Sequence, residues 1–71
     1  MKHKCRIGLT GKFINSATPE DIKRIAIFFE EIKKIEGVEV NEEILEISYE
    51  PSQSNILQLL ADKYLLQINN N

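Results

Sequence analysis

The chain has 71 residues, of which 42% are apolar and 28% charged, and its formal net charge is −2. This length predicts one domain, residues 1–71, and excludes two lobes with a catalytic cleft between them. No apolar run approaches the roughly 18 residues of a membrane span, and the charged amino terminus is unlike a secretory signal. The single cysteine cannot form an internal disulfide, so we expect a cytoplasmic protein. The slightly acidic balance argues against a nucleic-acid partner.

The first predicted element is a strand over residues 3–10. Its side chains alternate, with Cys5, Ile7 and Leu9 on one face and Lys4, Arg6 and Gly8 on the other. This period of two is typical of a half-buried strand. Residues 11–17 follow as a loop, and we expect either Phe13 or Ile14 to be tucked beneath it.

A long helix is predicted from Thr18 to Gly37. Thr18 can cap it, Pro19 suits the first helical position, and Asp21 stands near capping-box spacing. Gly37 can adopt the left-handed conformation that closes a helix. Steps of three and four separate the apolar residues that should face the core. They are Ile22, Ile25, Ala26, Phe28, Phe29, Ile32 and Ile35, with Phe28 at the edge of the stripe.

Two short strands are expected next. Val38 and Val40 flank Glu39 in the first, and residues 41–43 form a hairpin turn. The second strand places apolar side chains on one face and polar ones on the other, and Pro51 ends it. Its apolar residues are Leu45, Ile47 and Tyr49.

The last predicted elements are a helix and an edge strand. Ser52 or Ser54 is expected to cap the helix. Its apolar positions are Ile56, Leu57, Leu59, Leu60 and Tyr64. Residues 65–68 are interpreted as a short fourth strand, and residues 69–71 as a frayed polar tail.

The order strand–helix–strand–strand–helix–strand is that of the split βαβ, or ferredoxin-like, α+β fold. In this βαββαβ sandwich, four strands form an antiparallel sheet, two helices cover one face, and the first strand lies beside the third. The charges fit this placement. Residues 1–12 hold four Lys or Arg and no acid, whereas residues 36–50 hold six Glu and no base. We interpret the segments as neighbouring strands with complementary outer faces, in preference to two separate recognition patches.

The runs Gly37-Val-Glu-Val-Asn41 and Ile44-Leu-Glu-Ile-Ser-Tyr-Glu-Pro51, followed by a capped helix, resemble the heavy-metal-associated domain superfamily. The resemblance spans residues 4–68. Metal-binding members hold soft ions with a Met-x-Cys-x-x-Cys loop before the first helix, because thiolates suit such ions. The equivalent loop, residues 10–18, has no cysteine, methionine or histidine. The chain thus resembles a degenerate heavy-metal-associated-like domain without the metal site. Such members occur alone or attached to cation-transporting ATPases.

Four candidate site patterns have simpler explanations. His3 and Cys5 share a strand face, but two ligands are too few for a metal site, so we expect an exposed histidine and a core cysteine. Gly11-Lys12 matches only the end of a phosphate-binding loop, because Phe13 stands where that motif needs Ser or Thr. The predicted open sheet face is charged, without the aromatics that RNA recognition needs. The one histidine has no catalytic partner at a recognisable spacing, so no enzyme is expected.

These observations predict a small, non-catalytic binding domain with a protein or domain partner, no cofactor and no assigned catalytic, cofactor-binding or metal residues. The resemblance implies a link to cation transport. An exposed edge strand offers a route to a homodimer. Two alternatives stay open. One is a small-ligand regulatory module of the ACT type, which shares the strand order and binds amino acids near a glycine placed like Gly11. The other is metal ligation through His3 and Cys5 between two chains.

Overall fold

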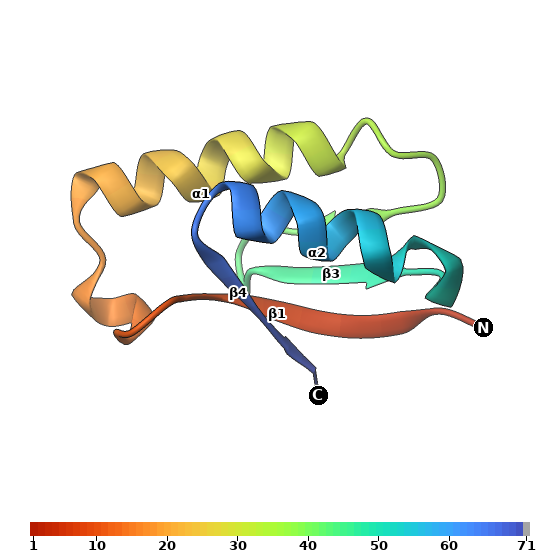
Figure 1. The fold of residues 1–71 in the computed structure, drawn as a ribbon, viewed down its shortest axis with the longest axis horizontal. Helices are drawn as coiled ribbons and strands as arrows, with labels where there is room; N and C mark the ends of the chain where they lie inside the picture. Colours follow the sequence, from red (N-terminus) through yellow and green to blue (C-terminus); the bar gives the residue numbers. More distant parts are fainter. Residues whose placement is uncertain (71) are drawn as a thin grey trace.

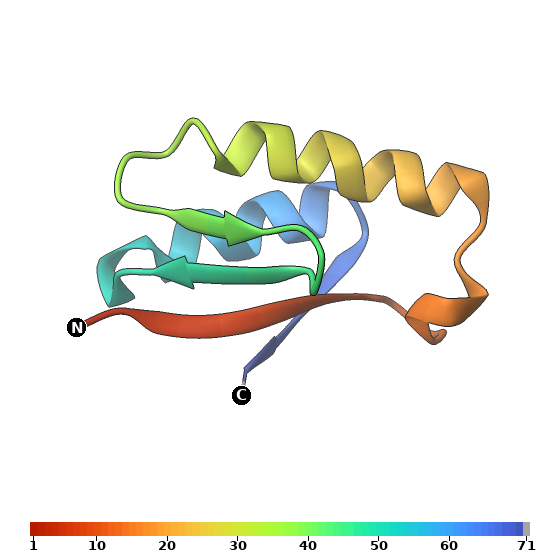
Figure 2. The ribbon, with the colours of Figure 1, turned by 180° about the vertical axis from the view of Figure 1, so that it is seen from behind.

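The computed structural model describes residues 1–70. Its strands are β1 (His3–Leu9), β2 (Glu39–Asn41), β3 (Glu46–Tyr49) and β4 (Leu66–Asn70), and its α-helices are α1 (Pro19–Ile32) and α2 (Ser54–Lys63). The sheet order is β2-β3-β1-β4, with every neighbouring pair antiparallel. Both helices lie on one face of the sheet (Figure 1), and the view from behind shows the same layering (Figure 2). This α+β arrangement is compatible with a ferredoxin-like fold.

β1 is a central strand because both of its edges are paired. Cys5 faces Ile47 of β3, and Ile7 faces Ile68 of β4. Cys5, Ile7 and Leu9 are buried, so the predicted alternation of this strand is confirmed. These side chains point towards the helices and form the sheet half of the core.

The start of α1 is as predicted. The Thr18 hydroxyl accepts a hydrogen bond from the Asp21 backbone N–H (3.2 Å), and the Asp21 carboxylate accepts one from the Thr18 backbone N–H (2.9 Å). This is a capping box, and Pro19 fills the first helical position. The side-chain oxygens thereby satisfy backbone donors that a helix leaves without internal partners.

The predicted end of the first helix at Gly37 is wrong, because α1 stops at Ile32. Tighter turns follow, in which the Ile35 N–H bonds to the Ile32 carbonyl (3.0 Å), and Gly37 takes a positive φ of 88°. The Gln53 side chain donates to the Glu36 carbonyl (2.7 Å). This long-range bond connects the segment after the helix to the 3₁₀ turn before α2.

The buried face of α1 also differs from the expected stripe. Phe28, predicted at its edge, is fully buried, whereas Ile22 is 58% exposed. Phe28 lies under α2, where its ring meets that of Tyr64 edge-to-face at 6.4 Å. The buried face of α1 is therefore turned towards α2 relative to the predicted stripe, and Ile22 lies outside it.

The β2–β3 hairpin is present, but its turn is longer than expected. Leu45, predicted within a strand, lies in the turn at Glu42–Leu45 with a positive φ of 54°. Its carbonyl still accepts a hydrogen bond from the Ile7 N–H (2.8 Å). Ile47 and Tyr49 are buried, as the alternation predicted.

The predicted serine caps of α2 are wrong, since Gln53 holds the N-cap position. Pro51 instead begins a 3₁₀ turn, Pro51–Gln53, in which the Gln53 side chain accepts from the Glu50 N–H (2.8 Å). α2 buries Leu57 and Ala61, while Ile56 and Leu59, two of its expected apolar positions, are exposed.

The predicted fourth strand is confirmed with shifted bounds. β4 starts at Leu66 and continues through Asn69 and Asn70, which pair with Arg6 and Cys5 of β1 and so are not a frayed tail. Asn71 lies outside the described residues. None of the helices within residues 1–70 has the length and apolar character needed to cross a membrane.

The two charged segments are neighbours, as the strand order required. Arg6 stands opposite Glu46, and Lys4 stands opposite Ser48. Ion pairs between the two segments connect Lys2 with Glu39 (2.5 Å) and the amino terminus with Glu50 (3.6 Å).

Candidate functional site

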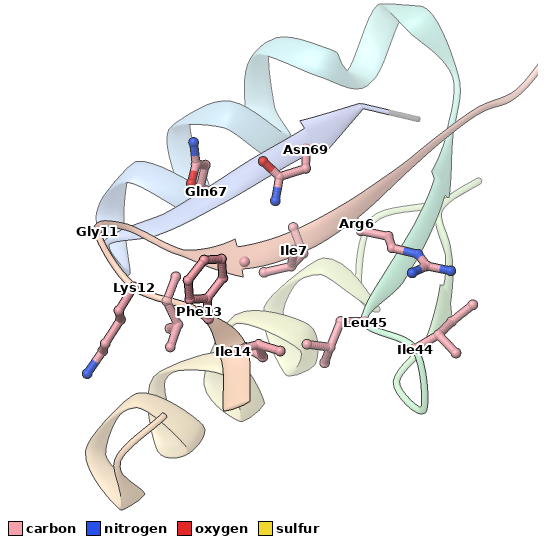
Figure 3. A pocket seen from close by; sticks show the side chains of 12 residues that line it. Arg6, Ile7, Gly11, Lys12, Phe13, Ile14, Ile44, Leu45, Gln67 and Asn69 are labelled. Carbon is pink, nitrogen blue, oxygen red and sulfur yellow. The ribbon is translucent and has the colours of Figure 1, made fainter. Parts of the chain in front are cut away.

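A surface groove lies at the end of the sheet where β1 turns towards α1. Its volume is about 530 Å³, and we call it the β1-end groove. Four parts of the chain line it: the second half of β1, the loop that follows, the β2–β3 turn and β4 (Figure 3).

The loop after β1 presents apolar side chains to solvent. Gly11 takes a positive φ of 79°, which lets the chain reverse so that Lys12 bridges back to Leu9. A short 3₁₀ turn at Ile14–Ser16 follows. Phe13 is 83% exposed and Ile14 is 43% exposed, so the prediction that one of them is tucked under the loop is wrong. Ala17 packs against the core in their place.

The β2–β3 turn forms the opposite wall. The Asn41 side chain accepts a hydrogen bond from the Glu43 N–H (3.2 Å), which folds the turn locally. The bond from Ile7 to the Leu45 carbonyl fastens the turn to β1. Ile44 is consequently held at the groove wall, where it is 42% exposed.

The sheet supplies the polar part of the groove. Gly8 pairs with Gln67, and a Cβ at Gly8 would stand 2.9 Å from Asn69 Nδ2. A side chain at position 8 would therefore displace the amide of Asn69. The Arg6 guanidinium extends to the side of the groove that carries Ile44 (Figure 3). Within residues 1–70, Arg6 takes part in no ion pair.

Lys12 belongs to a separate network. Its ammonium pairs with Asp21, a buried carboxylate that also binds Arg24. The hydrogen bond from Lys12, followed by the Thr18 backbone N–H and then Arg24, lowers the pKa of Asp21 well below its ordinary value. Figure 3 shows Lys12 pointing away from the groove. Lys12 therefore connects the loop to α1, and its ammonium is paired with Asp21.

A second hollow adjoins the groove. It has a volume of about 370 Å³ and is lined mainly by apolar side chains, among them Ile22 and Ile25 of α1. Ile14 and Leu45 line both hollows. The exposed side chains of Phe13, Ile14, Ile22 and Ile44 thus belong to one apolar end of the molecule.

His3 and Cys5 have different environments. Cys5 is fully buried, and burial, with a smaller contribution from Glu46, raises the pKa of its thiol to about 11. His3 is exposed and meets the Tyr49 ring edge-to-face at 5.9 Å. Within residues 1–70, no group of three or more His, Cys, Asp or Glu is arranged to hold a metal ion.

The sequence led to no assigned site residues, and it missed the side chains that the fold brings together at this groove. Arg6, Gln67 and Asn69 reach the groove only through strand pairing. Ile44 did leave a signal, because two adjacent apolar residues, Ile44 and Leu45, break the alternation at the expected turn. No protein-family model, curated protein or solved structure matches this chain.

Proposed function

We propose that this chain is a non-catalytic binding domain of the ferredoxin-like βαββαβ class, and that it contacts a protein or domain partner through the β1-end groove. The observation that carries the proposal is the exposure of Phe13, Ile14 and Ile44 around one groove. Exposed apolar side chains that gather at a hollow are typical of interaction sites, whereas single ones are common on any surface.

The resemblance to heavy-metal-associated-like domains fits this proposal. The two runs that carry it fall on β2, β3 and the start of the 3₁₀ turn before α2. The loop that holds the metal in binding members is here the loop that carries Phe13 and Ile14. In our proposal, an apolar contact surface replaces the metal site. A link to cation transport rests on the resemblance alone, and a cytoplasmic location rests on the single cysteine.

One observation favours a second candidate, a small-ligand regulatory module of the ACT type. Gly11 lines the groove, and the groove volume lies within the roughly 300–1,000 Å³ common for ligand sites. The third hypothesis, metal ligation through His3 and Cys5 between chains, is opposed by the burial of Cys5.

The proposal is tested by nuclear magnetic resonance on the ¹⁵N-labelled chain, titrated with a mixed library of short peptides and separately with the free amino acids. Saturable shifts from peptides are expected at Gly8, Gly11 and Ile44, and they should disappear in the double variant Phe13→Ser, Ile44→Ser. The control is Ile56→Ser, Leu59→Ser, which removes two exposed apolar side chains from α2. Peptide shifts that survive the groove variant would overturn the proposal. Saturable shifts from an amino acid alone would favour the regulatory module.

A further inference from the structure

We propose that the β1-end groove recognises an acidic peptide segment in which a carboxylate stands next to a large apolar residue. This inference rests on the proposed function, because it names the chemistry of the partner at the same groove.

The charge of the groove points to an anionic partner. The titratable side chains that line it within residues 1–70 are both basic, Arg6 and Lys12, although the whole chain carries a net charge of −2. Lys12 is neutralised by Asp21. Arg6 is therefore the cation that the groove offers to a ligand. A guanidinium binds carboxylates through two parallel hydrogen bonds, which gives direction as well as affinity.

The apolar walls point to a large side chain beside the carboxylate. Ile44 lies on the same side of the groove as Arg6, while Phe13 and Ile14 come from the opposite wall (Figure 3). An apolar residue seated between these walls would place a neighbouring carboxylate within the range of Arg6. Gln67 and Asn69 add amide donors and acceptors that can pair with a peptide backbone.

Glu46 is the acidic group that faces Arg6 within the sheet. The two residues are directly opposite in the β1–β3 register, and Glu46 is only partly exposed. Glu46 thus attracts the same guanidinium that the ligand would use, and it repels an anionic ligand. Removal of the Glu46 charge is expected to strengthen binding of the acidic peptide, whereas removal of the Arg6 charge should weaken it.

A separate peptide fits this groove better than a second copy of the chain. In the acidic and apolar run Glu42-Glu43-Ile44 of this protein, the apolar residue, Ile44, is itself part of the groove wall. The same Ile44 side chain would then have to serve as wall and as ligand in each copy. A peptide from another chain meets no such conflict.

The experiment uses four short synthetic peptides of one length, followed by the shifts of Gly8 and Gly11 in the ¹⁵N-labelled chain. The first peptide carries Glu beside Leu and Phe, the second replaces Glu by Gln, the third replaces Glu by Lys, and the fourth replaces Leu and Phe by Ala. Binding of the first peptide alone is expected. Arg6→Gln should weaken it about tenfold, as expected for one charged hydrogen-bonded contact, whereas Glu46→Gln should tighten it.

The matched control is Lys4→Gln, which removes a cation from the same strand and the same face but outside the groove lining. Equal weakening by Arg6→Gln and Lys4→Gln would overturn the inference, because the effect would then be one of net charge. Equal binding of the Glu and Gln peptides, abolished by Phe13→Ser, Ile44→Ser, would overturn the inference and leave the proposed function standing. Absence of groove shifts with all four peptides would defeat the inference. If the mixed library also gives none, the proposed function fails too. Concentration-dependent self-association that broadens the groove signals would identify a second copy as the occupant and also overturn the inference.

Discussion

Leu65 shows how a single residue ends α2 without the usual signal. It follows the helix in the left-handed region, with a φ of 59°, and its side chain is 66% exposed. Its N–H bonds to the Asp62 carbonyl (3.2 Å), and its own carbonyl accepts from the Thr10 hydroxyl (3.2 Å). Glycine or asparagine normally occupies such a position, because a leucine Cβ crowds the following carbonyl.

We therefore expect Leu65→Asn to raise the free energy of unfolding, by about 0.5–1 kcal/mol from relief of backbone strain. Urea unfolding followed by circular dichroism measures the change. The control is Leu59→Asn, an exposed leucine in regular helix, which should lose up to about 0.7 kcal/mol through helix propensity. If both variants lower the free energy of unfolding equally, the backbone at Leu65 is not strained.

Cys5 provides a second prediction at the scale of one residue. Because burial raises the pKa of the thiol to about 11, the thiolate that reacts with alkylating reagents is scarce at pH 8. Iodoacetamide should label the native protein at least tenfold more slowly than the protein in urea, as mass spectrometry can show. A Cys5→Ala, Asn15→Cys variant carries an exposed thiol and should react equally fast in both conditions. Rapid labelling of native Cys5 would contradict its burial.

At the scale of the element, the start of α1 depends on Asp21. This carboxylate completes the capping box and also holds Lys12 and Arg24, while Arg24 in turn donates to the Tyr64 carbonyl. One acid thus connects the loop after β1, the first helix and the junction between α2 and β4. The groove wall that carries Phe13 follows directly from Lys12, so Asp21 also helps to position the proposed binding surface.

The lowered pKa of Asp21 predicts a pH dependence of stability with a defined sign. A carboxyl group whose pKa is lower in the folded state stabilises the protein above its unfolded pKa of about 3.9, and this contribution falls as the pH drops towards the folded pKa. Asp21→Asn should therefore lower the melting temperature at pH 7 and reduce its fall between about pH 5 and pH 2. Part of the slope should remain, because hydrogen bonds lower the pKa of Glu31, through Tyr64, and of Glu39, through Lys2.

The control for this prediction is Glu20→Gln, which removes the same charge from the same helical turn outside the Asp21 network. Thermal unfolding of both variants across this pH range gives the comparison. Equal changes in slope would mean that general charge at the start of the helix, and not the Asp21 network, governs the acid sensitivity.

Elements that depend on local chemistry were the ones that sequence could predict. The Thr18 cap, the β1 alternation and the strand break at Pro51 each follow from side chains within a few residues. The end of α1 was misplaced, because the glycine signal at Gly37 closes the tighter turns that follow the helix and not the helix itself. The start of β4 was off by one residue because Leu65 gives no stop signal. The sequence could not predict the polar side of the groove, because only strand pairing brings Arg6, Gln67 and Asn69 close to the loop.

At the scale of the whole molecule, no single element forms the groove. Its walls come from two connections and its polar side from the sheet, so the fold holds exposed apolar side chains around one groove. Such an arrangement suits recognition, because little of the binding surface must become ordered when a partner arrives. The apolar end formed by Phe13, Ile14, Ile22 and Ile44 would otherwise be a liability for association.

The central position of β1 has a consequence for the way this protein is made. β1 precedes its neighbours in the chain, because β3 and β4 both come from the second half of the given sequence. Helix α1 can form early, whereas the sheet must wait for distant segments, and such non-local pairing slows folding. During synthesis the apolar face of Cys5, Ile7 and Leu9 is without its partners. β4, which follows β3 in the chain, closes the remaining edge of β1.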